Sequence, residues 1–410
     1  MSMIRISMLE DGLYAPGASG EIDIEPFSLR KGADNRGRGR MPLYPRGVRP
    51  KPRDDFWAYL ERSLAHEAKA LPANAPVVAL VHGFQFEPAM PVITPPHHDK
   101  AENPHARLYH FHEYDYGSGD LAIAMRAHST SWPLGLGVRD RDAGASGLCL
   151  GFAWDSYPDF FGSLFRHGRN FYARAYEVAE TAAWQLLCAL EVAATVLDRR
   201  IDLFAHSLGT RVVVRALADA LSPLPGNRAM LEYDDPTLWT VRPVLRHVDR
   251  VLLLAGAERV MEAQLLMARI NSWSEKTGGA DGLQFYNVVS RENDVLDKLG
   301  ENLGPASPGS KQVIGHNGLE KRDPRWLDLQ LDDEAVAEWF ATAPRDYRVS
   351  GDNRSVFAVM DHWIHYTWPD NMRVYHDILR SRAAWRIADI KRDRPALFDR
   401  IRINRGPGAD

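Results

Sequence analysis

Residues Ile201–Arg211, IDLFAHSLGTR, decide how this chain is organised. The segment 200–206 is an apolar run of the length expected for a strand buried on both faces. The residues that follow, 208–221, carry apolar side chains at helical spacing. The chain is therefore predicted to pass from a strand to a helix at Ser207.

A serine at such a sharp turn takes a strained conformation that exposes its hydroxyl above the sheet. The residues two before and two after it must be small, and Ala205 and Gly209 meet that requirement. The next backbone N–H, that of Leu208, lies at a helix N-terminus, where it can donate to a developing oxyanion. The pattern predicts that Ser207 is a nucleophile, and the alternative is an ordinary serine that caps a helix.

A second oxyanion donor is predicted after an earlier strand. Residues 75–84, APVVALVHGF, form another buried apolar run that ends in the turn sequence His82-Gly83. The backbone N–H of Phe84 is the candidate donor, because this architecture takes its second donor from the loop after that strand. We interpret His82 as a structural residue of the turn and not as a catalytic base.

Strand-like and helix-like segments alternate along the whole chain, which indicates an α/β fold with a mostly parallel central sheet and helices on both faces. Strands are expected at residues 3–9, 21–27, 75–84, 147–154, 200–206, 248–257, 283–290 and 355–360. Helices are expected at residues 54–71, 171–197, 208–221, 259–273 and 372–390.

Three segments depart from this alternation within what we predict to be one domain at residues 1–385. Residues 85–147 are irregular and rich in proline and glycine, which is typical of an insertion or lid. Residues 30–53 form a basic, solvated loop, and residues 386–410 form a basic C-terminal tail. The insertion holds histidines whose spacing matches no known zinc pattern, so no metal site is expected from them: His97, His98, His105, His110 and His112.

Composition limits the class of protein. Hydrophobic residues make up 45% and charged residues 25% of the 410 residues, as in a folded chain with a large core, and the net charge of −4 gives no general reason to expect nucleic acid binding. Cys149 and Cys188 each lie in an apolar run and are expected to be buried thiols in a reducing compartment. The chain begins with no long apolar segment and has no uninterrupted apolar stretch of about 18 residues, so we expect a cytoplasmic protein without a membrane span.

Five segments together resemble the α/β-hydrolase superfamily, and within it the bacterial serine esterase or lipase-like branch. They are LVHGF, GFAWDSYPD, IDLFAHSLGTRVVVRAL, YNVVSRENDVLD and MDHWIHYTW. The resemblance covers roughly residues 77–379 and is loosest in the insertion. This chain has Ala205 where glycine is commoner in the family, a change that is sterically compatible with the turn.

The resemblance implies a catalytic triad in the chain order serine, acid, histidine. It assigns the acid to Asp294, after the strand at 283–290, with Glu258 after the preceding strand as the alternative. It assigns the general base to His362, just past the expected last strand, with His365 as the nearest rival and His316 as a weaker one.

The function that this set implies is hydrolysis of a carboxylic ester through an acyl-enzyme, with a small-molecule or lipid-like ester as substrate and with no metal or organic cofactor. An acyltransferase or thioesterase with the same nucleophile is an alternative. A catalytically silent binding protein with a hydrolase fold is another.

Overall fold

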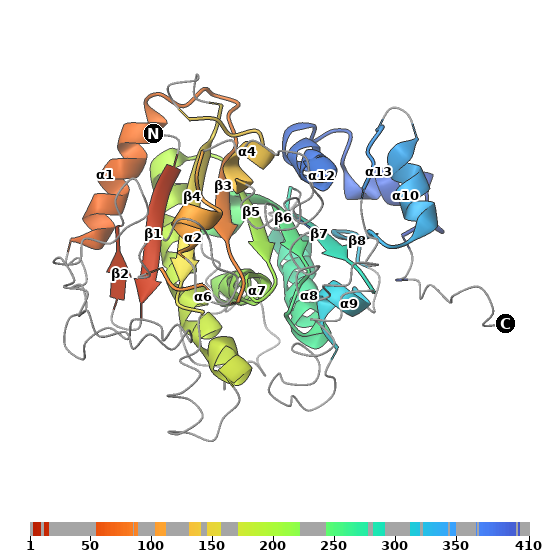
Figure 1. Cartoon of the computed structure of the whole chain (residues 1–410), viewed down its shortest axis with the longest axis horizontal. Helices are drawn as coiled ribbons and strands as arrows, with labels where there is room; N and C mark the ends of the chain where they lie inside the picture. The colour runs from red at the N-terminus through yellow and green to blue at the C-terminus, as the bar shows by residue number, and fades with distance from the viewer. Residues whose placement is uncertain are drawn as a thin grey trace, which may run out of the picture.

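The described residues form an eight-stranded sheet (Figure 1). The computed structural model describes residues 3–9, 12–15, 55–84, 86–88, 103–111, 131–140, 146–156, 171–221, 243–277, 282–291, 312–319, 323–342, 345–349, 366, 369–398 and 401. The strands are β1 (Met3–Leu9), β2 (Gly12–Tyr14), β3 (Val77–Val81), β4 (Leu148–Trp154), β5 (Ile201–His206), β6 (Val248–Leu254), β7 (Gln284–Val289) and β8 (Trp326–Gln330).

The strand order is β2-β1-β4-β3-β5-β6-β7-β8, and only the edge pair β1–β2 is antiparallel. Strands β3, β5 and β6 lie in the middle, and every residue of the three is buried. This is why their sequences are nearly continuous apolar runs. Because neighbouring strands are parallel, the carboxyl ends of β3 and β5 meet at one edge of the sheet.

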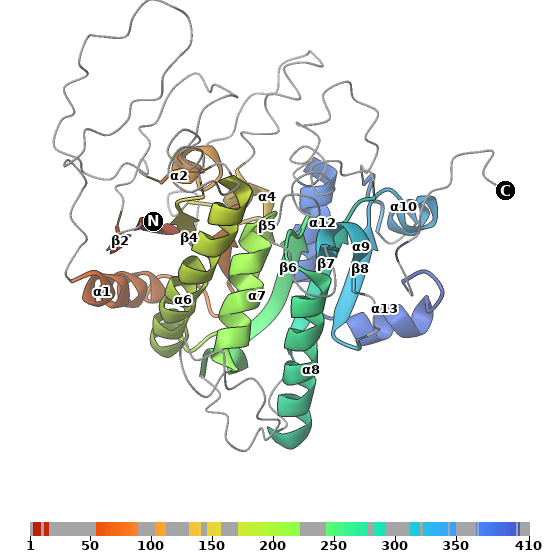
Figure 2. The ribbon, with the colours of Figure 1, turned by 90° about the horizontal axis from the view of Figure 1, so that it is seen from below.

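Helices cover both faces of the sheet (Figure 2). On one face, α6 and α7 pack against each other and against the strands, and α7 also contacts α8. On the other face, α4 and α12 lie together. The described helices are α1 (Phe56–Ala68), α2 (Pro104–Arg107), α4 (Trp132–Gly135), α6 (Phe171–Leu197), α7 (Gly209–Ala220), η4 (Pro243–Arg246), α8 (Val260–Thr277), α9 (Ile314–Asn317), α10 (Glu334–Ala341), α12 (Pro369–Arg380) and α13 (Ile387–Asp393).

Strand β5 shows how alternate side chains are divided between these two layers. The ring of Phe204 packs against Trp132 of α4 and Tyr375 of α12, with ring centroids 5.1 Å and 5.8 Å away. Since side chains alternate along a strand, Leu203 and Ala205 point to the opposite face, where α7 packs on β5. The α/β class, the mostly parallel sheet and its helical cover are thus confirmed.

Most of the expected elements are found. Helix α6 has the expected bounds, and β1, β3, β4, β5, β6, β7, α1, α7 and α8 lie within or close to the expected ranges. The strands expected at residues 21–27 and 355–360 and the basic loop at 30–53 lie outside the described residues. Strands β2 and β8 and helix α10 were not expected.

The single helix expected at residues 372–390 is wrong, because α12 and α13 are two helices separated by residues 381–386. The break occurs where the backbone carbonyls of Arg382 and Trp385 accept hydrogen bonds from the guanidinium of Arg250 on β6. Within the expected tail at 386–410, Ile390 of α13 is buried, and so is Phe398. The described start of that segment is therefore part of the core.

The described parts of the region 85–147 also pack into the core. Tyr109 and Trp132 are fully buried, and the Tyr109 hydroxyl donates a hydrogen bond to the carbonyl of Phe152 on β4 at 3.2 Å. The residues between these parts lie outside the described chain. A lid therefore stays a prediction for this region.

Helix α6 is the one described helix that is long and apolar enough, by length and composition, to cross a membrane. Half of its most apolar window is buried inside the structure. It packs against α1, α7 and β4. The core helix of a folded domain has the same length and composition, so this finding is weak evidence for a membrane span.

A buried ionic network fastens the C-terminal segment to the sheet. Asp202 of β5 is fully buried and accepts hydrogen bonds from Arg382 at 2.7 Å and from the backbone N–H of Arg250 at 3.1 Å. Arg382 also binds Asp249 at the start of β6. Burial outweighs these partners and raises the pKa of Asp202 from 3.8 to about 6.

This shift predicts a pH dependence of stability with a definite sign. A carboxyl whose pKa is higher in the folded state binds its proton more tightly there, so its contribution to stability falls as pH rises from about 4 to about 6. The expected loss is about 3 kcal/mol in the free energy of unfolding, relative to the Asp202→Asn variant. Urea denaturation of both proteins at pH 4, 5, 6 and 7 measures the difference. Parallel pH curves for the two proteins would contradict the prediction.

Candidate active site at the turn after β5

Ser207 lies between the end of β5 at His206 and the start of α7 at Gly209. Its φ is +53°, in the left-handed region that residues other than glycine rarely adopt. Its backbone N–H donates to the carbonyl of Leu254 at 2.8 Å and so continues the pairing of β5 with β6. The expected strand–turn–helix geometry is present, and its strain is centred on the serine.

Several contacts hold the Ser207 backbone in this conformation. Its carbonyl accepts hydrogen bonds from the backbone N–H of Thr210 at 3.0 Å, from the Thr210 hydroxyl at 2.7 Å and from the N–H of Ala257 at 3.2 Å. Strained backbone persists only where the surroundings over-determine it, and it is concentrated at functional sites. The three donors that bind the Ser207 carbonyl hold its strained backbone in this way.

The end of β3 packs so closely against this turn that two glycines are required. A Cβ atom on Gly209 would lie 2.3 Å from the carbonyl oxygen of His82 and 2.5 Å from that of Val81. A Cβ atom on Gly83 would lie 2.7 Å from the Cβ of Ser207. The turn after β3 and the turn after β5 are therefore in direct contact, as the expected oxyanion site requires.

The two expected oxyanion donors lie on these two turns. Leu208 directly precedes α7, and the first N–H groups of a helix have no partner within it. Phe84 directly follows Gly83, and its ring packs edge-on against Tyr172 of α6, with centroids 5.6 Å apart. The structure thus brings the backbone segments of Ser207, Leu208 and Phe84 together.

His82 has a structural place in the turn. Its Nδ1 lies 2.8 Å from the carbonyl of Gly83, to which it donates, and its Nε2 accepts from the backbone N–H of Trp154 at 3.0 Å. Burial lowers the pKa of His82 to about 3, so the ring is neutral. Both ring nitrogens are occupied, which excludes His82 as a general base in this arrangement.

Two other described histidines near this edge of the sheet pack against neighbours. The ring of His206, adjacent to Ser207, lies 5.8 Å from that of Tyr366 and 6.5 Å from that of Trp132. The Nε2 of His316 lies 3.1 Å from the carbonyl oxygen of Arg291, and its Nδ1 lies 3.3 Å from the guanidinium of that residue. The weaker rival for the general base is therefore occupied on both ring nitrogens.

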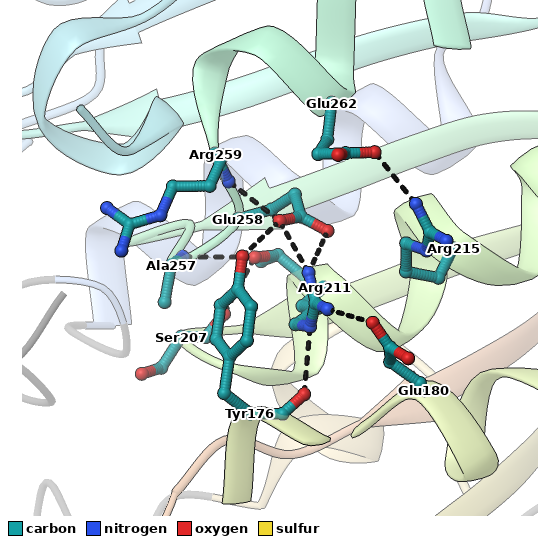
Figure 3. Close-up of polar contacts among 10 residues, drawn as sticks. Tyr176, Glu180, Ser207, Arg211, Arg215, Ala257, Glu258, Arg259 and Glu262 are labelled. Atoms are coloured by element: carbon teal, nitrogen blue, oxygen red, sulfur yellow. Dashed lines mark hydrogen bonds and ion pairs between the residues drawn. The ribbon is translucent and has the colours of Figure 1, made fainter. Parts of the chain in front are cut away.

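Glu258 is buried in an ionic cluster behind Ser207 (Figure 3). Its Oε1 accepts from Arg211 at 2.9 Å, from the Tyr176 hydroxyl at 2.9 Å and from the backbone N–H of Arg259 at 2.7 Å. The Ser207 hydroxyl points away from this cluster (Figure 3). Glu258 is thus a buried residue whose carboxylate, among the described residues, binds Arg211, Tyr176 and the backbone of Arg259, and its role as the alternative acid stays a prediction.

This cluster is what sequence reasoning missed. Arg211 lies on the mostly buried helix α7, and its side chain is only 5% exposed. The available signals were a charged residue, Arg211, at the start of the apolar run RVVVRAL and a glutamate directly after the strand expected at 248–257. The remaining predicted site residues, Asp294, His362 and its rival His365, lie outside the described residues.

No group of three histidine, cysteine, aspartate or glutamate side chains in the described part of the chain could hold a metal ion. Of the histidines in the region 85–147, His105 and His110 are described and buried. The Nε2 of His105 lies 2.8 Å from the hydroxyl of Ser7 on β1, and burial lowers the pKa of His105. Cys149 is buried and Cys188 is half-buried, and neither forms a disulfide in the described part of the chain.

Comparisons of the chain with protein-family models, with curated proteins and with solved structures found no match.

Proposed function

We propose that this chain is a serine hydrolase of the α/β-hydrolase type that cleaves a carboxylic ester through an acyl-enzyme. The observation that carries the proposal is the positive φ of Ser207, held at the end of a central parallel strand and directly before α7. The contact of Gly83 with Ser207 supports it, because a two-donor oxyanion site needs the loop after β3 beside the nucleophile.

In the proposed reaction, the Ser207 hydroxyl oxygen attacks the ester carbonyl while His362 takes its proton. The backbone N–H groups of Leu208 and Phe84 stabilise the oxyanion. When the carbonyl re-forms, the alcohol leaves with the proton from His362, and the acyl group stays on Ser207. Water then attacks the acyl-enzyme, with His362 as base again, and releases the acid. Asp294 orients the histidine and stabilises its charged form.

Two described neighbours in the chain support the assignments of His362 and Asp294. Tyr366 is four residues beyond His362, and its ring lies 5.8 Å from that of His206, next to the nucleophile. Ser290 follows the last residue of β7 and precedes Asp294 by four residues. Four residues span at most about 14 Å, so both side chains are within chain reach of this edge of the sheet.

Covalent labelling tests the proposal without knowledge of the substrate. The protein is expected to react with a fluorophosphonate probe, because activated Ser207 attacks phosphorus and displaces fluoride. Mass spectrometry of the digested product should place the adduct on Ser207. The Ser207→Ala variant should not react, whereas Ser274→Ala, a serine on α8 that binds Arg325, should react as the parent does. Labelling of Ser207→Ala at the parent's rate would overturn the assignment.

A further inference from the structure

We infer that the buried Arg211–Glu258 ion pair positions the catalytic turn, by holding Ser207 in its strained conformation and the start of α7 in place. This inference rests on the proposed function, since it concerns the nucleophile of that reaction. The Ser207 hydroxyl points away from Arg211 and Glu258, which lie on the other side of the turn (Figure 3). Arg211 and Glu258 are therefore positioning residues.

Arg211 makes two further hydrogen bonds besides those to its glutamate partner, both to helix α6. Its Nη2 donates to the Glu180 carboxylate at 2.5 Å and its Nε donates to the carbonyl of Tyr176 at 3.0 Å, both on α6. Its guanidinium also stacks 3.5 Å from the centroid of the Tyr176 ring. Because Arg211 is four residues beyond Ser207 at the start of α7, these bonds fix the first turn of that helix against α6.

Glu258 completes the link on the other side. Its two carboxylate oxygens accept from Nη1 of Arg211 at 2.9 Å and 3.1 Å. The preceding residue, Ala257, donates its N–H to the Ser207 carbonyl and also to the Thr210 hydroxyl. Two consecutive residues after β6 are thus bound to the catalytic turn, one through the backbone and one through a side chain.

The burial of both charges favours a role in geometry over a role in stability. The side chains of Arg211 and Glu258 are 5% and 0% exposed. A buried ion pair is often no more stabilising than apolar residues of the same size, because the two charges lose their water. The Arg211 guanidinium, however, makes directional hydrogen bonds to Glu258, to Glu180 and to the Tyr176 carbonyl. Such bonds fix the relative positions of α7, α6 and the segment after β6, which apolar packing alone would not do.

The chain offers a matched control one helical turn away. Arg215 of α7 binds Glu262 of α8 at 2.7 Å, and each lies four residues beyond its counterpart in the first pair (Figure 3). Among the described residues, the Arg215–Glu262 pair joins the same two parts of the chain, but its hydrogen bond does not involve Ser207, Thr210 or Ala257. If the loss of any ion pair between these two parts of the chain had the same effect, removing either pair would change stability and kcat equally.

The first experiment measures stability alone. Glycine adopts the φ of Ser207 without strain, so Ser207→Gly relieves whatever strain the surroundings impose. Its effect on the midpoint of urea denaturation is measured in the parent, in Arg211→Met/Glu258→Gln and in Arg215→Met/Glu262→Gln. We use the double variants because removing one partner alone leaves a buried charge, which can prevent folding. We expect the change in midpoint caused by Ser207→Gly to be less favourable in Arg211→Met/Glu258→Gln than in the parent. In Arg215→Met/Glu262→Gln, the change should equal that in the parent.

The second experiment measures ester turnover. Arg211→Met/Glu258→Gln is expected to lower kcat by about 10- to 100-fold with KM nearly unchanged, as for a small displacement of the reacting groups. Arg211→Lys, which keeps one bond of the pair, should recover part of the loss, and Arg215→Met/Glu262→Gln should keep the parent's kcat.

Two results would overturn the inference: an equal effect of Ser207→Gly in all three backgrounds, or an equal kcat for the two double variants. A parent protein without ester turnover would instead count against the proposed function. The stability experiment would still decide the inference in that case.

Discussion

Replacing Ser207 with alanine is expected to lower kcat for a p-nitrophenyl ester by about 10⁶-fold. The change removes only the nucleophilic oxygen, and the turnover left over reflects the oxyanion donors and substrate binding alone. Steady-state kinetics with acyl chains of several lengths measure the loss, and circular dichroism checks that the variant is folded. A loss of less than about tenfold for every chain length would contradict the role of Ser207.

The same assay decides which histidine acts as the base. His362→Ala should lower kcat nearly as much as Ser207→Ala, and the double variant should be no worse than either, because the two residues act as one unit. His365→Ala should have a much smaller effect. If the sizes of the two histidine effects are reversed, His365 is the base.

Gly209→Ala is expected to lower the free energy of unfolding by about 3 kcal/mol. Helix propensity alone predicts the opposite, a gain of about 1 kcal/mol, since alanine is the better helix former. The steric clash outweighs the helix propensity, so the free energy of unfolding should fall. The new methyl group would lie 2.3 Å and 2.5 Å from the carbonyl oxygens of His82 and Val81 at the end of β3. Backbone atoms of a central strand cannot turn aside as a side chain can. Urea denaturation measures the loss.

Gly282→Ala serves as the control for this prediction. The atom nearest to a Cβ on Gly282 is a carboxylate oxygen of Asp249 at 3.1 Å, which belongs to a side chain. Its stability change should stay within about 1 kcal/mol. A Gly209→Ala protein as stable as the parent would show that the turns after β3 and β5 can separate.

Hydrophobic pattern made the centre of the fold predictable. The runs that became β3, β5 and β6 are buried on both faces, so apolar residues occur at consecutive positions and not only at alternate ones. The turn at Ser207 was predictable as well, since a small residue was needed at Gly209 and the sequence supplies it. Local rules were sufficient wherever local sequence and tertiary packing favour the same structure.

Other features depend on contacts between distant residues. Strand β8 is only five residues long and includes Asp328, so its pattern is weak until it pairs with β7. The helical pattern continues from α12 into α13, but two backbone carbonyls between these helices accept hydrogen bonds from the Arg250 guanidinium. A charged residue on a helix most often faces water, so no local rule identifies Arg211 as the partner of Glu258, 47 residues away.

The cover on one face of the sheet has a consequence for the chain during its synthesis. In the described part of the protein, the face of β5 that carries Asp202, Phe204 and His206 is covered by α4 and by the segment from Tyr366 onward. A ribosome makes that segment after the eight described strands of the sheet. Until the segment has been made, the nascent sheet exposes the side chains of Asp202, Phe204 and His206, and chaperones protect such surfaces from aggregation during that interval.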